Sequence, residues 1–380
     1  MSPKPGAGES APWSLASLGE RALLREVLRK LRAASPDERL LVSAGDDAAA
    51  LLLPPGEAAV LTTDTLVEGT HFRRPWAAPQ DLGWKAIMSA ASDVSAMGGR
   101  PLAAVVAVSA PPAMTAAEFQ ALMTGAEMAA KEAGLLITGG DTTAAAILVL
   151  TATVLGAAPP QGLVKRSGAR VGDLVAVTGV LGEAGAGLGI VDKLFGEDPL
   201  PVDGRWLRAE SPLAVIDERL RERGFDPPAA TALAEAARRF LRPAPPFAAG
   251  PILSSGGATA LIDVSDGLAS EATWIAEESG VGIVIDAARV PLGAGARPWA
   301  SYRGIDPITL AFGGGEDYEL LLTVPESAWS DLDRRLRAIG VWGTVIGAVV
   351  PESEGVTWRG PDGFRRPLAG QGYEHFAPPA

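Results

Sequence analysis

The chain has 380 residues, of which 47% are hydrophobic, enough to build two domains of about 100–200 residues each. Its 45 acidic and 33 basic side chains give a net charge of −12, and because no basic run accompanies this balance, nucleic acid is excluded as the main partner. Cysteine is absent and only two histidines occur, which excludes disulfides, cysteine nucleophiles and His-rich metal sites. Any metal is therefore expected to be a hard cation bound by oxygen, such as Mg²⁺.

The N-terminus predicts a loose tail rather than a membrane segment. No run of about 18 apolar residues occurs in the chain, so no membrane span and no membrane partner are expected. The first residues, MSPKPGAGESAP, are polar and rich in proline and glycine, without an apolar signal core. They predict a disordered tail at residues 1–16 and a cytoplasmic protein.

Hydrophobic periodicity and turn residues predict mixed helices and strands in both halves. The first half is expected to contain a helix at 17–33, a strand at 58–67, a helix at 82–99, a strand at 101–110, a helix at 115–134, and strands at 135–141 and 146–158. After a polar linker at 159–173, the second half is expected to contain a strand at 174–179, helices at 184–196 and 228–241, a strand at 258–265, a helix at 267–280, strands at 281–287 and 318–325, a helix at 328–340, a strand at 344–350 and a hairpin within 355–370. This pattern predicts an α/β (α+β) protein with an N-terminal domain at 17–160 and a C-terminal domain at 161–380.

Residues 115–134 carry the clearest helix signal. Thr115 and Glu118 have the spacing of a capping box, and Gly134 follows the last apolar position. An apolar face at helical spacing lies between them. This helix is therefore expected to begin and end at these residues.

Acidic residues stand beside glycines or hydroxyl residues where predicted elements end. They occur in GDDAA (45–49), TTDT (62–65), ASD (91–93), GGDTT (139–143), DVSD (263–266) and GGGEDYEL (313–320). Each alone is explained by a turn or a helix cap, and for Asp266 capping of the following helix competes with a ligand role. Asp93 is different, because it lies on a helix face of small and apolar residues, where an unpaired charge is costly. Carboxylates that converge in one cleft would repel one another, which favours several Mg²⁺ ions shared with a polyphosphate.

Glycines next to these acids support phosphate binding. Gly139 and Gly140 precede Asp141, and 313–315 are all glycine, so backbone N–H groups can approach a phosphate closely; a flexible turn is the alternative at each place. No P-loop motif occurs. The glycines at 185, 187 and 189 do not follow the dinucleotide fingerprint and are interpreted as helix-packing residues.

Eight segments in this order resemble the thiamine-monophosphate kinase family, whose fold is similar to that of the aminoimidazole-ribonucleotide synthetase (PurM-like) superfamily. The segments are GDDAA, TTDTLVEGTHF, SDVSAMGG, GGDTT, KRSGARVGD, DVSDGL, GGGEDYEL and GYEHF. The resemblance runs from about residue 17 to 376, but it is poor around 195–250. Ala90 stands where the family more often has Asn.

The resemblance implies ATP-dependent phosphorylation of thiamine monophosphate to thiamine diphosphate with several Mg²⁺ ions. It implies a two-domain fold and a homodimer whose N-terminal sheets pair. The implied metal ligands are Asp47, Thr62, Thr63, Asp64, Asp93, Asp141, Asp263 and Asp266. The implied ATP contacts are Gly140, Asp141, Arg166 and Ser265, and the implied thiamine contacts are His71, Glu316 and Tyr373.

The chemistry is consistent with this composition. A phosphate monoester has a second pKa of about 6, so the acceptor is mostly ionised at neutral pH and needs no general base or protein nucleophile. Arg166 would bind ATP phosphates, Glu316 would offer the thiazolium an opposite charge or a hydrogen-bond acceptor, and Tyr373 would offer it an aromatic face. Each also has an ordinary explanation: a linker arginine, a turn residue and a packing residue.

Two alternatives remain. Other ATP-dependent enzymes of the superfamily are one, but the hydrogenase-maturation and selenophosphate-synthetase relatives rely on a cysteine or selenocysteine that this chain lacks, and an aminoimidazole-ribonucleotide synthetase would lack the VEGTHF and GGGEDYEL pair. A non-catalytic Mg²⁺-nucleotide-binding protein is the other. Such a protein would not need the acceptor-side residues His71, Glu316 and Tyr373.

Overall fold

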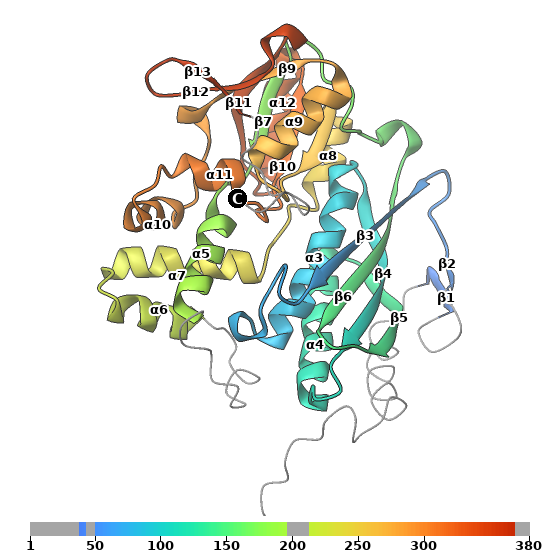
Figure 1. Ribbon diagram of the computed structural model, residues 1–380. Coiled ribbons are helices and arrows are strands. Elements are labelled where there is room, and N and C mark those ends of the chain that lie inside the picture. The colour runs from blue at the N-terminus through green and yellow to red at the C-terminus, as the bar shows by residue number, and fades with distance from the viewer. Residues whose placement is uncertain (1–37, 43–49, 196–212, 369–380) are drawn as a thin grey trace, which may run out of the picture.

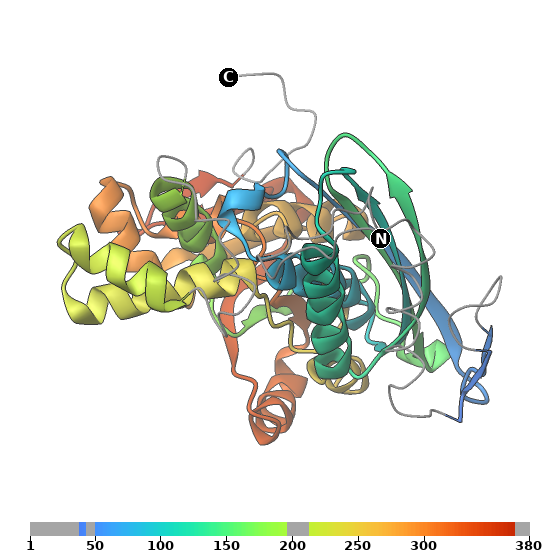
Figure 2. The same ribbon diagram turned by 90° about the horizontal axis from the view of Figure 1, so that it is seen from below.

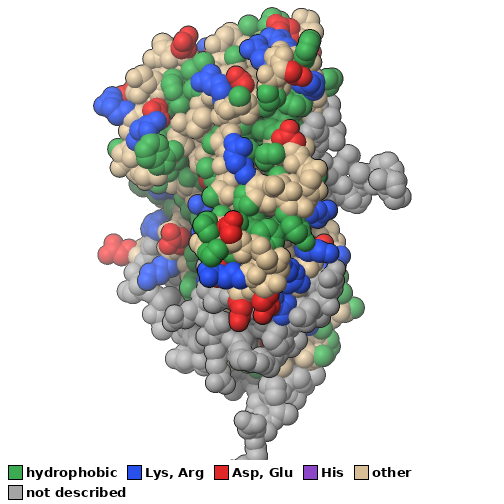
Figure 3. Space-filling view, turned by 90° about the vertical axis from the view of Figure 1, so that its left-hand side faces the viewer, with side chains coloured by type: hydrophobic (Ala, Val, Ile, Leu, Met, Phe, Trp, Pro, Cys, Tyr) green, Lys and Arg blue, Asp and Glu red, His purple; other side chains and the backbone are tan. Residues whose placement is uncertain are grey.

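A computed structural model gives the structure of residues 38–42, 50–195 and 213–368, and all structural statements below concern these ranges (Figure 1). Within them, no helix is both long and apolar enough to cross a membrane. The tail expected at 1–16 and the helix expected at 17–33 lie outside the described residues. On the face shown in Figure 3, acidic and basic side chains are interspersed among apolar ones.

The first half forms a four-stranded sheet with two helices on one face (Figures 1 and 2). The strand order is β3, β6, β4, β5, and only β4 and β5 run parallel. The elements are β1 (Leu40–Val42), β2 (Ala50–Leu51), β3 (Ala58–Val67), η1 (Arg74–Trp76), α3 (Pro79–Ala96), β4 (Arg100–Ala110), α4 (Ala116–Ala133), β5 (Leu136–Ala144), β6 (Val149–Ala158) and η2 (Pro160–Gly162). The helices and strands expected between 58 and 158 are confirmed, with small shifts at their ends.

Alternation along the strands separates a covered face of this sheet from an open one. Leu150, Ala152 and Val154 of β6 are fully buried under the helices. On the opposite face, Leu61 of β3 is 72% exposed and Val105 of β4 is 39% exposed. Because side chains alternate along a strand, the helices cover one face and leave the other with apolar side chains in contact with solvent.

Helix α4 begins and ends where its capping residues predicted. The Thr115 hydroxyl accepts the backbone N–H of Glu118 at 3.1 Å, and the Glu118 carboxylate accepts the N–H of Thr115 at 2.7 Å. Gly134 has a φ of 69° and closes the helix in the left-handed region, which glycine adopts without strain. The capping-box prediction is therefore confirmed.

The second half contains a seven-stranded mixed sheet and a group of helices. The strand order is β13, β12, β9, β11, β7, β10, β8, with β9 and β12 parallel and the other pairs antiparallel. The elements are β7 (Leu174–Thr178), α5 (Glu183–Phe195), α6 (Leu213–Glu222), α7 (Pro227–Leu241), α8 (Ala249–Ser255), β8 (Ala260–Asp263), α9 (Leu268–Ser279), β9 (Gly282–Asp286), η3 (Ala287–Arg289), α10 (Ala296–Arg303), α11 (Ile308–Gly313), β10 (Leu320–Val324), α12 (Glu326–Ala338), β11 (Gly343–Val350), η4 (Glu352–Glu354), β12 (Val356–Arg359) and β13 (Arg365–Pro367).

Both faces of this sheet are buried. Val175 and Val177 of β7 belong to the apolar core that includes α9 and α11, whereas Ala176 belongs to the core that includes α8 and α12. Helices α5, α6, α7 and α10 form a group on the helix-covered side of the first half (Figure 2), where α7 contacts α3 and α5 contacts η1. Their apolar residues continue the core of the first half. The two halves therefore share one continuous core through these helices.

Four helices of the second half were not expected from the sequence: α6, α8, α10 and α11. Pro251 lies in the first turn of α8 and Pro298 in the first turn of α10. Proline is tolerated in a first turn because the N–H groups there have no helical partner, although it usually signals a break. The strand expected at 258–265 is also shorter at both ends, because β8 covers only Ala260–Asp263.

The three glycines of α5 pack closely, as the sequence predicted. A Cβ at Gly187 would lie 2.2 Å from the carbonyl oxygen of Ala236 on α7, and a Cβ at Gly189 would lie 2.6 Å from the Trp299 indole of α10. Helix α5 can approach its neighbours at these distances only without side chains at these positions.

We predict that Gly187→Ala lowers the free energy of unfolding by about 1–3 kcal/mol, because the added methyl forces α5 and α7 apart. Chemical denaturation monitored by circular dichroism measures this change. Thr231→Ala, on an exposed position of α7, is the matched control and should change stability little. Equal stability of Gly187→Ala and the unmodified protein would contradict the close contact.

Candidate functional site

Helix α3 lies between the two sheets, and its side chains contact both. The Asp93 carboxylate accepts the Thr62 hydroxyl of β3 at 2.5 Å. The neighbouring Ser92 donates its hydroxyl to Asp263, the last residue of β8. Two adjacent residues of one helix therefore bring a carboxylate from each half of the chain to the same place.

Two cavities meet at Asp93 and Asp263. The first, which we call the His71 cavity, has a volume of about 430 Å³ and is lined by His71 and by the 313–316 segment. The second, the Arg166 cavity, also has a volume of about 430 Å³ and is lined by Lys165, Arg166 and Ser167. Asp93 and Asp263 line both, so they lie at the boundary between two separate binding volumes.

The His71 cavity has an apolar and an acidic part. Its apolar wall consists of Leu66, Trp76, Leu188 and Phe240. Its acidic wall consists of Asp64, Asp93, Asp263, Asp266 and Glu316. It can therefore accommodate a ligand with an aromatic or apolar end and an end that binds through cations.

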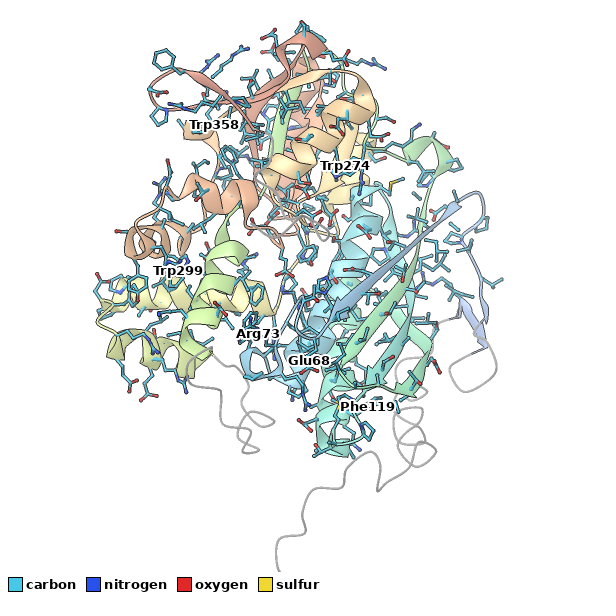
Figure 4. All side chains as sticks on the ribbon, viewed as in Figure 1. Glu68, Arg73, Phe119, Trp274, Trp299 and Trp358 are labelled. Carbon is cyan, nitrogen blue, oxygen red and sulfur yellow. The ribbon has the colours of Figure 1, made fainter. Side chains whose placement is uncertain are left out.

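The ring of His71 is held by the backbone. Its Nδ1 accepts the N–H of Val67 at 3.0 Å, which places the proton of the neutral ring on Nε2. The Arg73 guanidinium, labelled in Figure 4, lies in the segment between β3 and α3, 4.9 Å from the centre of the Trp76 ring. Trp76 itself lines this cavity.

The Arg166 cavity is the more basic of the two. The Arg166 guanidinium lies 5.8 Å from the centre of the Trp274 ring, which Figure 4 places on α9. Trp274 is 44% exposed, so this pair lies near the surface. Lys165 and Arg166 give this side of Asp93 and Asp263 a positive wall suited to phosphate oxygens.

Burial and mutual repulsion disfavour the charged forms of the two shared carboxylates. Burial raises the pKa of Asp93, and the nearby Asp64 raises it further, while the Thr62 hydrogen bond lowers it. Burial, and then the charge of Asp93, raise the pKa of Asp263 to about 7. Both carboxylates would therefore be stabilised by a bound cation.

The loop after β8 is fixed by a carboxylate that the sequence analysis missed. Glu271 of α9 accepts the N–H groups of Asp266 at 2.8 Å and of Ser265 at 3.2 Å through Oε1. Its other oxygen is buried and has no hydrogen-bond partner among the described residues. Burial raises the pKa of Glu271 to about 8. The only sequence signal was an acidic residue in the first turn of the helix, which is common at that position.

Asp266 does not cap α9. The N-cap is Gly267, with a φ of 111°, and a Cβ there would lie 2.4 Å from the Phe312 carbonyl oxygen. The close approach of the 312–315 segment requires glycine at this point. The sequence left two roles open for Asp266, a helix cap and a ligand. The structure excludes the N-cap role and places Asp266 in the lining of the His71 cavity.

The acids of the GGGEDYEL segment point in three directions. Glu316 pairs with Lys85 of α3. Asp317 accepts the N–H groups of Gly182 at 2.6 Å and Ala184 at 2.9 Å, and so caps α5. Glu319 accepts the Thr178 hydroxyl at 2.6 Å. Of these three acids, only Glu316 lines the His71 cavity. Asp317 and Glu319 hold the segment in place through their hydrogen bonds.

The structure brings together most of the residues implied by the resemblance. The His71 cavity is lined by Thr63, Asp64, His71, Asp93, Asp263, Ser265, Asp266 and Glu316. Thr62 and Arg166 line the Arg166 cavity. Asp47 and Tyr373 lie outside the described residues. Ser265, implied as an ATP contact, lines the His71 cavity and not the Arg166 cavity.

Gly140 and Asp141 do not join this group within one chain. They lie on β5, and β6 and β4 separate β5 from β3, which corresponds to about 14 Å at usual strand spacing. Asp141 pairs with Ala107, which pairs with Thr151, which pairs with Thr65, and these four side chains share the open face of the sheet. Asp64 precedes Thr65 on β3, so its side chain lies on the covered face. Within one chain, the expectation that all these acids gather in one volume is therefore wrong for Asp141. The error arises because hydrophobic periodicity predicts strands but not their order in the sheet.

Buried carboxylates make stability depend on pH. Besides Asp263, burial raises the pKa of Asp317 and of Glu319 to about 7, from ordinary values of 3.8 and 4.5. At pH values between the ordinary pKa and the raised pKa, each of these groups is protonated in the folded state and ionised in the unfolded state. The stabilisation that these groups contribute is present at low pH and is lost as pH rises through about 7.

We predict that the metal-free protein melts at a lower temperature at about pH 8 than at about pH 5.5, as measured by differential scanning calorimetry. Glu319→Gln, which keeps a hydrogen-bond acceptor for Thr178 but does not titrate, should weaken the pH dependence. A melting temperature that rises over this interval would contradict the assignment.

Comparison with known proteins agrees with the family resemblance of the sequence motifs. The model for the N-terminal domain of AIR synthase related proteins matches residues 45–158, and the model for their C-terminal domain matches residues 170–359. The chain is 35% identical over 309 residues to a thiamine-monophosphate kinase of Mycobacterium tuberculosis, covering 81% of each chain. It is 32% identical over 364 residues to that of Escherichia coli, covering 95% of this chain and 99% of the relative.

Solved structures agree. The thiamine-monophosphate kinase of Stenotrophomonas maltophilia superposes with a TM-score of 0.73 at 29% identity, covering 90% of this chain and 97% of the other. AaThiL complexed with AMPPCP and TMP superposes with a TM-score of 0.68 at 28% identity, covering 94% and 97%. The chain therefore belongs to the AIR synthase related family and, within it, to the thiamine-monophosphate kinases.

Proposed function

We propose that this protein transfers the γ-phosphate of ATP to the phosphate of thiamine monophosphate and so forms thiamine diphosphate in the cytoplasm. The observation that carries the proposal is that two cavities of similar volume meet at Asp93 and Asp263. A reaction between two bound phosphate compounds needs such an arrangement. A structural relative complexed with AMPPCP and TMP supports the same pair of ligands.

The linings of the cavities suggest which ligand each would hold. Lys165 and Arg166 suit the phosphates of ATP, because guanidinium and ammonium groups bind phosphate oxygens strongly. Trp76 and Phe240 suit the flat rings of thiamine. The phosphate of thiamine monophosphate would then point from the His71 cavity towards Asp93.

The transfer needs no protein nucleophile. The acceptor phosphate is already mostly ionised at neutral pH, so the chain has to position two anionic groups in line and exclude water. The backbone of the 264–266 loop, held by Glu271, and the 313–316 segment form the walls that would do this. We therefore propose direct in-line transfer without a phosphoenzyme.

The residues at the boundary fit Mg²⁺. All the donors there are oxygens, and burial together with mutual repulsion disfavours their charged forms. Within the described ranges no group of three or more acidic or histidine side chains forms a complete metal cage. Mg²⁺ takes one or two carboxylates and completes its shell with water and phosphate. When bound, it would screen the charges of the two phosphate groups.

The residues that would hold Mg²⁺ are Thr62, Thr63, Asp64, Asp93, Asp263 and Asp266, with Asp47 and Asp141 as further ligands implied by the family. On the chain's own side, the Thr62 hydroxyl orients Asp93 and the Ser92 hydroxyl orients Asp263. These two hydrogen bonds fix the carboxylates at the boundary between the cavities.

A homodimer would explain the position of Asp141. Both β3 and β5 are edge strands of the first sheet, and its open face carries the exposed Leu61 and Val105. If the N-terminal domains (17–160) of two copies pair through these surfaces, β5 of one copy lies beside β3 of the other. We propose that Gly140 and Asp141 of the partner subunit complete each site.

We predict that purified protein with Mg²⁺, ATP and thiamine monophosphate forms thiamine diphosphate, detected by chromatography, and that thiamine itself is not phosphorylated. Asp93→Asn and Asp263→Asn should each lower kcat at least about 100-fold, because each removes a negative charge that would hold Mg²⁺ where the phosphates meet. Asp331→Asn, a 57% exposed carboxylate on α12, is the matched control and should leave the rate unchanged. An active Asp263→Asn variant, or no product with the unmodified protein, would contradict the proposal.

We predict that subunit mixing restores activity between two inactive variants. Co-expressed Asp141→Asn and Asp266→Asn chains should regain about a quarter of the normal activity, because half of a random mixture is mixed dimers and one of their two sites is intact. Each variant alone is the control. If the mixture stays inactive although mixed dimers form, Asp141 acts within its own chain; if Asp141→Asn alone is active, Asp141 has no role in the site.

A further inference from the structure

We propose that Lys85 determines how the substrate is recognised: by pairing with Glu316 it neutralises this carboxylate and holds it as a hydrogen-bond acceptor, not as a counter-ion for the cationic ring. This inference rests on the proposed function and concerns the thiamine side of the same site.

The pair is buried at its lysine end. Lys85 Nζ lies 2.8 Å from Glu316 Oε2, and the Lys85 side chain is only 3% exposed, compared with 22% for Glu316. The same ammonium lies 3.7 Å from the centre of the Phe240 ring. A buried ammonium requires a partner of opposite charge, so the Lys85 ammonium already balances the charge of Glu316 before any ligand binds.

The backbone also fixes Glu316. Its φ is 58°, and Tyr318 has a φ of 51°; these are the only non-glycine residues with positive φ within the described ranges. The Glu316 N–H donates to the Ser265 carbonyl at 2.7 Å, and the Tyr318 N–H donates to the Val264 carbonyl at 2.8 Å. A conformation that costs about 1–3 kcal/mol is maintained only where the surroundings impose it, and such places are typical of binding sites.

The Lys85 pair connects the two halves of the chain at the wall of the His71 cavity. Lys85 projects from α3, and Glu316 belongs to the segment that holds the loop after β8. Among the described residues Glu316 Oε2 is bound by Lys85, and no hydrogen bond to Oε1 occurs. Because Glu316 lines this cavity, Oε1 is the oxygen left for a ligand there.

Because Lys85 and Glu316 together carry no net charge, Glu316 selects for a hydrogen-bond donor on the ligand more than for a positive charge. Thiamine carries both a cationic thiazolium ring and an amino group on its pyrimidine ring. The amino group is the donor that matches Glu316 Oε1. The thiazolium ring would instead lie against aromatic faces of the cavity, such as that of Trp76.

The test compares Michaelis constants in three variants: Lys85→Met, Glu316→Gln and the double variant. If Lys85 orients Glu316, Lys85→Met should raise KM for thiamine monophosphate at least about 5-fold and leave KM for ATP unchanged. If Glu316 were a counter-ion, removal of Lys85 would expose its charge and lower KM for the cationic substrate. That decrease, or an equal change in both KM values, would overturn the inference.

The analogue oxythiamine monophosphate, in which a carbonyl replaces the amino group, gives a second measurement. The unmodified enzyme should strongly prefer thiamine monophosphate, because a site that binds an N–H group rejects an analogue without it. The double variant should shift the kcat/KM ratio towards the oxo analogue at least about 10-fold, since the glutamine amide can donate. An unchanged ratio would contradict the role of Glu316 as acceptor.

A readout independent of activity covers the case in which a single variant is poorly folded. In a double-mutant cycle of unfolding free energies, the double variant should be more stable than the sum of the two single changes predicts, because each single change leaves a charge unpaired. Additive effects would show that the two side chains do not interact. An inactive unmodified enzyme would refute the proposed function and leave this stability result valid.

Discussion

The arrangement of this protein depends on helix α3 holding Asp93 and Asp263 together at the junction of its two halves. Asp93 belongs to the helix, and Asp263 is reached through the neighbouring Ser92. Both carboxylates are held by hydroxyl groups, and burial raises the pKa of each. The charged forms of these carboxylates are therefore unfavourable until a cation binds, and a bound cation can in turn bind phosphate groups.

The local structure of this site could be predicted from the sequence because its signals are local. The capping box of Thr115 and Glu118 begins α4, and the alternation of residues 58–67 gives β3. Acids placed between glycines and hydroxyl residues at element ends pointed to a phosphate-binding cleft. The fold class expected from the family resemblance is confirmed by the domain matches and by the superposed structures.

Other features could not be predicted because they depend on contacts between distant segments. Asp141 looked equivalent to Asp64, but strand order puts two strands and the opposite face of a sheet between them. Lys85 and Glu271 carry no local signal of their roles, because the loops that they contact from α3 and α9 are distant in sequence. Likewise, no local pattern separates the three acids of GGGEDYEL; only the family resemblance singled out Glu316, which alone of the three lines the His71 cavity.

The central claim is that a cation and two phosphate groups meet at Asp93 and Asp263. The most direct measurement is anomalous scattering from crystals grown with Mn²⁺, a non-hydrolysable ATP analogue and thiamine monophosphate. We predict anomalous peaks within coordination distance of both carboxylates, about 2.0–2.3 Å, between the two ligands. Peaks that lie elsewhere while both ligands are bound would contradict the account.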